Sequence, residues 1–230
     1  MPELTQPLRL ALVGMPGCGK STVGRHLARQ LGLRFADSDS EIEQRIGMPI
    51  RDYFADQGEA AFRQIEAEVI AQLAGQPGIV LATGGGAVLR PSNRDALHSQ
   101  MHVFYLRATP EDLHRRLRND THRPLLQVAD PLRKLRELYR ERDPLYRRTA
   151  HFVVESVRPS VPALTGMVLM QLELAGLVDP AQVPAQIGAA PATPTAGDAL
   201  HAALSPAGSK AGPPPGMPAD DTAASKSPAT

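Results

Sequence analysis

The sequence has one cysteine and no tryptophan, and aromatic residues make up only 4% of it. A single cysteine excludes an intramolecular disulfide framework and a cysteine-based zinc site. The shortage of aromatics leaves no interleaved stacking surface of the kind that binds single-stranded nucleic acid. The composition therefore favours neither a disulfide scaffold nor a nucleic-acid-binding module.

The chain also lacks an excess charge and a long apolar run. Its 25 Lys and Arg against 24 Asp and Glu give a formal net charge of +1, which is no footprint for nucleic acid. The first six residues are polar, and no stretch approaches the length of a membrane span. Most basic residues are arginines, whose planar guanidinium suits carboxylates and phosphates. We expect a cytoplasmic protein, monomeric, with small anionic substrates and without nucleic-acid or membrane partners.

The clearest motif runs from Gly14 to Thr22 and fits the phosphate-binding pattern G-x-x-x-x-G-K-[ST]. An apolar segment, Leu8–Val13, precedes it and a helical pattern follows it, which is the strand, loop and helix context that the pattern requires. Loop N–H groups and the helix dipole would then point at phosphates. We expect Lys20 to reach the β- and γ-phosphates and the Ser21 hydroxyl to bind Mg²⁺.

Two carboxylates, Asp37 and Asp39, follow a short predicted strand at residues 33–36. On an extended backbone, residues i and i+2 point to the same side, so both would face the phosphate loop. One could hold hydrated Mg²⁺ while the other accepts a hydroxyl proton. The alternative is that Ser38 or Asp39 caps a helix over residues 41–46, since Ser38 fits a capping box with the glutamate that starts that helix. Beside a phosphate loop, we favour catalysis for at least one carboxylate.

A helix is predicted over residues 59–74, after a short helical piece at 51–55 and a turn at Gly58. Arg63 and Glu66 lie beside its apolar face at i and i+3. A solvated ion pair is the ordinary interpretation of such a couple. The two side chains could also reach over the edge of the helix toward a ligand.

The predicted buried strand at residues 79–82 ends in three consecutive glycines, Gly84, Gly85 and Gly86. Three glycines are costly to order, so they indicate a sharp turn or a close approach of the backbone to a ligand. The aspartate that often follows this strand in phosphate-loop proteins is absent. Its absence favours Asp37 as the carboxylate on the metal side.

The rest of the chain continues the alternation of strands and helices. Strands are predicted at 101–106 and 151–154, and helices at 91–98, 110–118, 132–142 and 161–174, the last apolar on most sides and therefore packed. About five strands within residues 1–177 predict one α/β domain, a five-stranded parallel sheet with helices on both faces. A polar segment with arginines at 116 and 123 suits a lid. Residues 178–230 are rich in Pro, Ala and Gly and predict a disordered tail.

Six motifs occur in order between Leu8 and Leu174: G-M-P-G-C-G-K-S-T-V-G-R-x-L-A, D-S-D, F-R-x-I-E, T-G-G-G-A-V, R-P-L-L and R-x-P-L-Y. Together they resemble the shikimate kinase family. The resemblance implies a P-loop kinase fold and transfer of the γ-phosphoryl group of ATP to the 3-hydroxyl of shikimate. The products would be ADP and shikimate 3-phosphate, in aromatic amino-acid (chorismate) biosynthesis.

The resemblance also implies roles for particular residues. Asp39 would contact the acceptor hydroxyl as base, Arg123 would neutralise the transferring phosphoryl group, and Lys20 would complete the catalytic set. The metal would lie between Ser21 and, through water, Asp37. Shikimate would contact Asp39, Arg63, Glu66, Gly84, Gly85, Gly86 and Arg142, and ATP would contact Gly17, Cys18, Gly19, Lys20, Ser21, Thr22, Arg116, Arg123 and Arg158.

Another small-molecule kinase of the same architecture, such as a gluconate or nucleoside monophosphate kinase, would share the phosphate loop. The D-S-D motif, Arg63 and the three glycines argue against it, because together they suit a hydroxylated carboxylic acid.

Overall fold

The computed structural model describes residues 7–117, 130–155 and 160–179. All of them belong to the first of the two units into which the chain divides, Met1–Gly188. Three predicted features lie outside the described residues: the lid with Arg123, the ATP contact Arg158, and residues 180–230 of the tail predicted over 178–230.

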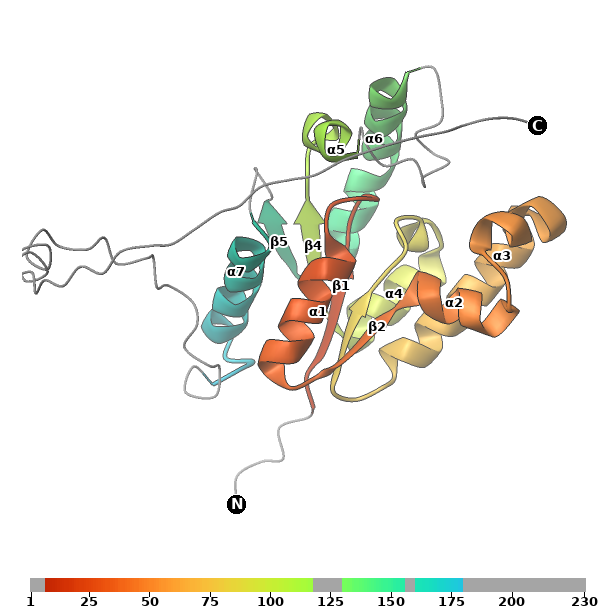
Figure 1. Cartoon of the computed structure of the whole chain (residues 1–230). Coiled ribbons are helices and arrows are strands. Elements are labelled where there is room, and N and C mark those ends of the chain that lie inside the picture. Colours follow the sequence, from red (N-terminus) through yellow and green to blue (C-terminus); the bar gives the residue numbers. More distant parts are fainter. Residues whose placement is uncertain (1–6, 118–129, 156–159, 180–230) are drawn as a thin grey trace, which may run out of the picture. The chain divides into compact units, whose positions relative to one another are not determined.

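Five parallel strands form one sheet in the order β2-β3-β1-β4-β5 (Figure 1). The pairs β2–β3, β3–β1, β1–β4 and β4–β5 are all parallel, as the sequence predicts. The middle strands are almost wholly buried because helices cover both faces of the sheet. The strands are β1 (Arg9–Val13), β2 (Arg34–Asp37), β3 (Ile79–Ala82), β4 (His102–Arg107) and β5 (Phe152–Glu155).

The helices form a layer on each side of this sheet. In Figure 1, α1 (Lys20–Leu31) and α7 (Val161–Leu174) lie in front of it and α4 (Pro91–Gln100) lies behind. The first two pack on each other, and α4 packs on β4 together with α6 (Pro131–Thr149). The remaining elements are α2 (Ser38–Ile46), α3 (Ile50–Ala74), the 3-10 helix η1 (Ala87–Leu89) and α5 (Pro110–Leu117).

The strand register brings three connections to one edge of the sheet. Leu12 in β1 and Asp37 in β2 both align with Ala82 in β3. After β1, the chain forms β2 and β3 on one side of that strand and then β4 and β5 on its other side. The direction in which strands are added to the sheet therefore reverses beside β1. Ligands bind at such a point, outside the carboxyl ends of the strands. The phosphate loop, the D-S-D motif and the glycine turn all follow strands at this edge.

Gly58 divides α3 into two helical pieces, as predicted. Its backbone has φ 78° and ψ 175°, a left-handed conformation that a side chain disfavours. A Cβ atom at this position would meet nothing within 4 Å, so the backbone angle alone calls for glycine.

The prediction for α6 was wrong, because the helix continues to Thr149 with Pro144 inside it. Proline has no N–H, so one helical hydrogen bond is lost there. The buried Tyr146 ring stacks on Tyr105 with 5.0 Å between centroids, and Ala150 N–H donates to the Tyr146 carbonyl. Packing of this last turn outweighs the cost of the proline.

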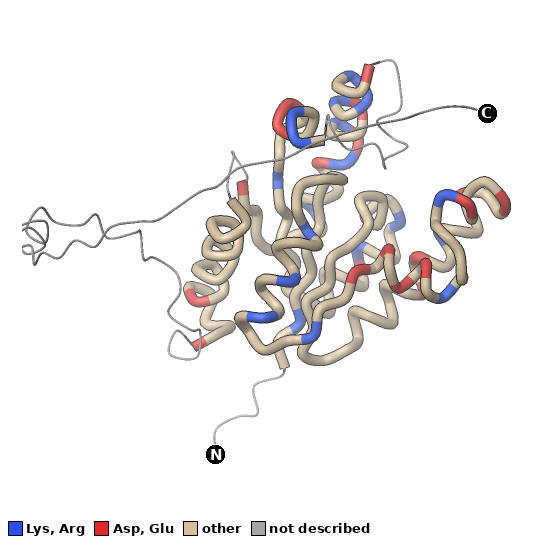
Figure 2. The backbone as a smooth tube through the Cα atoms, viewed as in Figure 1, with Lys and Arg blue, Asp and Glu red and all other residues tan. Residues whose placement is uncertain are grey.

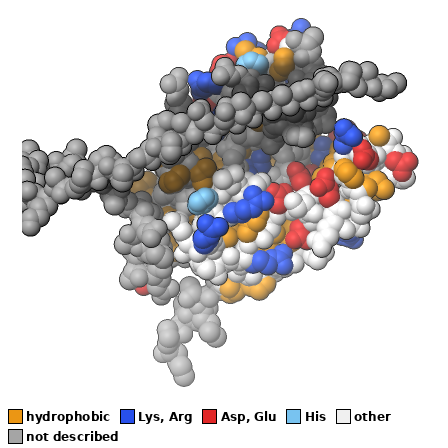
Figure 3. All heavy atoms as spheres, viewed as in Figure 1, with side chains coloured by type: hydrophobic (Ala, Val, Ile, Leu, Met, Phe, Trp, Pro, Cys, Tyr) orange, Lys and Arg blue, Asp and Glu red, His pale blue; other side chains and the backbone are white. Residues whose placement is uncertain are grey.

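The prediction that α7 is packed on most sides was also wrong. Val168 and Leu172 are buried against its neighbours, whereas Met167 and Met170 are 40% and 50% exposed. Charged residues are frequent on α2, α3, α5 and α6, whereas α7 has almost none (Figure 2). On the face that Figure 3 shows, basic side chains gather over α1 and acidic ones over α2. Within the described residues, no helix is long and apolar enough to cross a membrane.

Gly24→Ala should lower the free energy of unfolding although alanine favours helices, because α1 packs tightly on Phe35 of β2 at this glycine. A Cβ there would lie 2.6 Å from the Phe35 ring and 3.3 Å from Leu12. Overpacking of this kind costs about 1–3 kcal/mol. Gly75→Ala is the matched control, since its Cβ would find only ordinary contacts from 3.7 Å outward. Urea unfolding checks both variants, and equal stability of the two would contradict the close packing of α1 on β2.

Candidate active site

The phosphate loop joins β1 to α1 and curls around a lysine. Gly17 and Gly19 have φ values of 81° and 102°, which a side chain would strain. Lys20, the first residue of α1, donates from Nζ to the carbonyls of Gly14 and Met15 at 2.9 and 3.0 Å. Its ammonium is therefore held inside the loop at the helix N-terminus, where phosphate binding is favoured.

Cys18 is fully buried in the same loop, and its Sγ lies 3.8 Å from the Lys20 Nζ. A Cβ on Gly14 would come within 3.0 Å of this sulfur. The cysteine side chain is thus a packing element of the loop, and the predicted contact of this residue with ATP stays a prediction.

Asp37 links the phosphate loop to α2. Its Oδ2 accepts a hydrogen bond of 2.6 Å from the Ser21 hydroxyl, and its Oδ1 accepts one of 3.1 Å from the Asp39 N–H. The helix therefore begins at Ser38 and is capped by Asp37, which corrects the predicted start at residue 41 with Ser38 or Asp39 as cap. Two hard oxygen donors in contact beside a phosphate loop fit Mg²⁺.

Ser38 has a different task, which the sequence did not indicate. It is fully buried, and its hydroxyl accepts a hydrogen bond of 2.8 Å from the Gly84 N–H. This bond ties the D-S-D motif to the glycine turn after β3. The only available signal was the position of a small hydroxyl between two aspartates.

Asp39 lies in the first turn of α2, not on the extended backbone that the sequence argument assumed. Burial and the neighbouring Asp37 raise the pKa of its carboxyl group to about 6, against the opposing charge of Lys20. The carboxylate lies directly against Gly84, where a Cβ would overlap its Oδ1. The carboxylates of Asp37 and Asp39 are neighbours because the D-S-D segment forms the start of helix α2.

The three glycines each leave room for a different part of the site. A side chain at Gly84 would collide with Asp39, one at Gly85 with Pro16 of the phosphate loop, and one at Gly86 with Arg63. The distances to Pro16 and Arg63 would be 2.7 Å. The sequence predicted a sharp turn or a close approach of this backbone to a ligand. In the structure, the backbone of the three glycines lies close to the phosphate loop, Asp39 and Arg63, which surround it.

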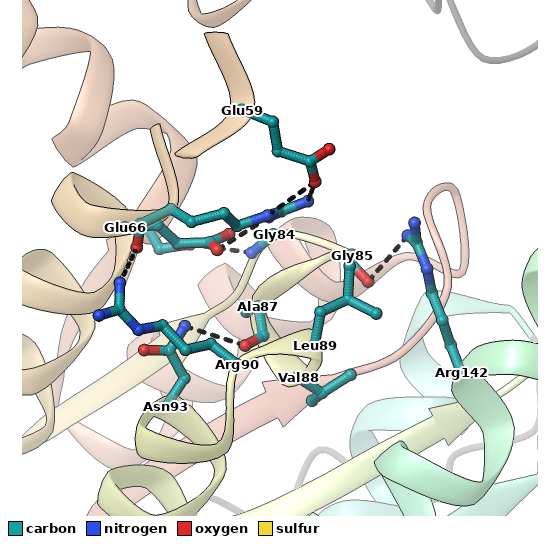
Figure 4. A network of polar contacts seen from close by, with 12 residues as sticks. Glu59, Glu66, Gly84, Gly85, Ala87, Val88, Leu89, Arg90, Asn93 and Arg142 are labelled. Carbon is teal, nitrogen blue, oxygen red and sulfur yellow. Dashed lines mark hydrogen bonds and ion pairs between the residues drawn. The ribbon is translucent and has the colours of Figure 1, made fainter. Parts of the chain in front are cut away.

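Arg63 forms a buried ion pair with Glu66, not the solvated pair that the sequence favoured. Arg63 Nη1 donates to Glu66 Oε2 at 2.8 Å, and Glu66 is 1% exposed. Although burial lowers the pKa of Arg63, its bonds to Glu66 and Glu59 raise that pKa above its ordinary value, so the guanidinium stays charged. Arg90 supports the same stretch, because its Nη1 donates to the Arg63 carbonyl at 2.9 Å (Figure 4).

Arg142 reaches the glycine turn from α6 on the side opposite Glu66 (Figure 4). Its Nη1 donates to the Gly85 carbonyl at 3.2 Å, and the Tyr146 hydroxyl donates to the same oxygen at 2.6 Å. The Arg142 Nε is buried, and no hydrogen-bond acceptor for it is present in the described part of the chain. An unpaired buried donor is costly, so this N–H suits an acceptor supplied by a ligand.

Tyr146 is a site residue that the analysis of the sequence missed, although it ends the R-x-P-L-Y motif. Its ring is fully buried against Tyr105, whose hydroxyl donates to Asp143 at 2.8 Å. These contacts fix the part of α6 that bears Arg142 to β4. The motif was the available signal, but the direction of the ring depends on the continuation of α6 past Pro144.

The adenine side of the predicted site is only partly described. Arg116 is exposed on α5. The structure therefore brings together Lys20, Ser21, Asp37, Asp39, Arg63, Glu66, the three glycines and Arg142, whereas the predicted roles of Arg116, Arg123 and Arg158 stay predictions.

Asp39→Asn should stabilise the folded protein at neutral and alkaline pH. Because folding raises the pKa of Asp39 from 3.8 to about 6, ionised Asp39 opposes folding above that range. The neutral side chain removes a cost of at most about 3 kcal/mol at pH 8, and the gain should vanish below about pH 4. Urea unfolding between pH 4 and 8 measures it. A gain that is equal at all pH values would contradict a raised pKa.

A family model described as Shikimate kinase matches residues 16–173. Two relatives named Shikimate kinase are similar along almost their whole length. One, from Paracidovorax citrulli, is 58% identical over 176 residues, 75% of this chain and 96% of that protein. The other, from Burkholderia pseudomallei, is 57% identical over 171 residues, 74% and 93% of the two chains.

Solved structures agree with this match. A shikimate kinase from Acinetobacter baumannii, solved in complex with shikimate, has a TM-score of 0.70 at 43% identity, covering 76% of this chain and 97% of that one. One from Aquifex aeolicus has a TM-score of 0.66 at 31% identity, covering 74% and 99%. The five-stranded parallel sheet and its helices are thus those of the P-loop kinases. This chain belongs to the shikimate kinase family, because the family model matches most of the chain and the relatives align along almost their full length.

Proposed function

We propose that this chain transfers the γ-phosphoryl group of ATP to the 3-hydroxyl of shikimate, a step in aromatic amino-acid biosynthesis. The observation that supports the acceptor most strongly is the arrangement of two arginines, the half-buried Arg63 and the buried Arg142, around the glycine turn beside Asp39. A carboxylate fits between such guanidinium groups. Family membership favours shikimate over the gluconate and nucleotide acceptors of related kinases.

The donor half of the proposed site is the phosphate loop from Gly17 to Thr22. Its N–H groups, the N-terminus of α1 and the Lys20 ammonium would stabilise charge on the phosphates. Ser21 and Asp37 would hold Mg²⁺, which neutralises phosphate charge when it is bound. The contact between these two side chains supports this assignment.

In the acceptor half, Asp39 would orient the hydroxyl and accept its proton. With a pKa of about 6, Asp39 is mostly ionised at pH 7 to 8 and still basic enough to take up a proton. Because phosphoryl transfer passes through a loose transition state, much of the contribution of Asp39 would be orientation. Glu66 would keep Arg63 in place, and the Gly84–Gly86 backbone would border the ring of the substrate.

Several further assignments rest on the family alone. We propose that Arg123 enters with the lid and contacts the transferring phosphoryl group, and that Arg116 and Arg158 lie near the adenine.

We also propose that residues 1–177 form the catalytic domain, that the enzyme is a monomer and that it acts in the cytoplasm. The end of α7 at Leu174 and the family match over residues 16–173 support the domain boundary.

Arg142→Lys should raise the Michaelis constant for shikimate about 10- to 100-fold, and that for ATP far less, because a lysine cannot replace a charge-assisted, forked contact with a carboxylate. Steady-state kinetics with each substrate varied in turn measures both constants. Arg147→Lys on the same helix is the control, since the exposed Arg147 pairs with Asp143. Equal effects of Arg142→Lys on both substrates would contradict the role.

Lys20→Met should reduce turnover by at least about 10²- to 10³-fold, because it removes the cation held against the phosphates. The fold should persist, since the hydrogen bonds that the variant loses lie within the phosphate loop, to the carbonyls of Gly14 and Met15 and to Cys18 Sγ. Coupled detection of ADP measures the turnover, and circular dichroism with thermal melting checks the fold. A folded variant with retained activity would overturn the proposed function.

A further inference from the structure

Glu59 occupies an edge of the Arg63 guanidinium that a substrate carboxylate could use. Arg63 has two groups of donors, and the Nη1 group belongs to the buried Glu66. The other edge is formed by Nε and Nη2, and both donate to one oxygen, Glu59 Oε1, at 3.2 and 3.0 Å (Figure 4). This is one of the edges with which an arginine can bind a carboxylate in a bidentate pair.

The two glutamates differ in how firmly they are held. The Glu66 side chain is 2% exposed and stays paired with Arg63, because a buried charge without its partner is costly. The Glu59 side chain is 66% exposed, and exposed i,i+4 ion pairs contribute little to stability. Another anion could therefore replace Glu59 at small cost, whereas it could not replace Glu66.

The backbone before Glu59 allows this exchange. Gly58 interrupts α3 immediately before it, and apart from its chain neighbours no described residue lies within 4 Å of the position that a Gly58 Cβ would take. Glu59 is thus the first residue of the second helical piece and has no continuous helix on its N-terminal side.

Glu59 and Arg63 also line a common hollow of about 320 Å³, together with Leu89 and Arg90. Arg90 is held by its bonds to the Arg63 carbonyl and to Gln64. Glu59 and Arg63 therefore border the same hollow.

We propose that Glu59 is a specificity-determining residue: an internal carboxylate that holds the outer edge of Arg63 in the free enzyme and is displaced by the carboxylate of the substrate. This inference rests on the proposed function. Competition with Glu59 lowers the affinity for the substrate and selects ligands whose carboxylate forms a better bidentate pair than Glu59 does. A ligand without a carboxylate leaves the internal pair in place.

The test is the affinity for shikimate of the full-length Glu59→Gln variant, measured by isothermal titration calorimetry. A glutamine keeps the shape but not the charge, so shikimate should bind about two- to five-fold more tightly than to the wild type. Shikimate methyl ester, which has the same ring without a negative charge, should show no such gain. Glu68→Gln is the matched control, because Glu68 lies on the same helix in an exposed ion pair with Arg45 and should leave both affinities unchanged.

Each outcome decides the inference. Unchanged or weaker binding of shikimate to Glu59→Gln would overturn it and would mean that Glu59 is neutral or orients Arg63 for the substrate. An equal gain for the methyl ester would also overturn it, since competition between carboxylates could not be the cause. A wild-type enzyme that neither binds nor phosphorylates shikimate would overturn the proposed function, and this inference with it.

Discussion

The active site depends on a lack of side chains at three consecutive positions. Gly84, Gly85 and Gly86 allow Asp39, the phosphate loop and Arg63 to approach one stretch of backbone, and a Cβ at any of them would overlap one of these groups. The φ of Gly86 is −96°, so space and not a left-handed backbone is what this residue supplies. The glycine turn is thus the point where the donor and acceptor halves meet.

The turn is held by polar bonds from three elements, and these bonds place the charges of the site. Ser38 from α2 accepts from the Gly84 N–H, while Arg142 and Tyr146 from α6 donate to the Gly85 carbonyl. Around it lie buried or half-buried charges, among them Lys20, Asp39 and Arg142. Such groups oppose folding unless they are paired, and the raised pKa of Asp39 is the direct sign of that cost. The site is arranged for a charged ligand at some expense of stability.

Local patterns in the sequence were sufficient to predict the alternation of strands and helices, the phosphate loop and the break at Gly58. They were insufficient where tertiary contacts decide the structure. Pro144 predicted the end of a helix, but α6 continues to Thr149, because burial of Tyr146 against Tyr105 stabilises its last turn. Likewise, helical spacing predicted a solvated pair at Arg63 and Glu66, whereas Glu66 is buried, on a helix that packs on α4.

We propose that a phosphate loop and two arginines around a glycine turn select a hydroxylated carboxylic acid as phosphoryl acceptor. The most direct test measures ADP release from ATP by the full-length protein with shikimate, gluconate, AMP or water alone as acceptor. Release should be fast with shikimate and slow with the others. Release with gluconate, AMP or water that equals the rate with shikimate would contradict it.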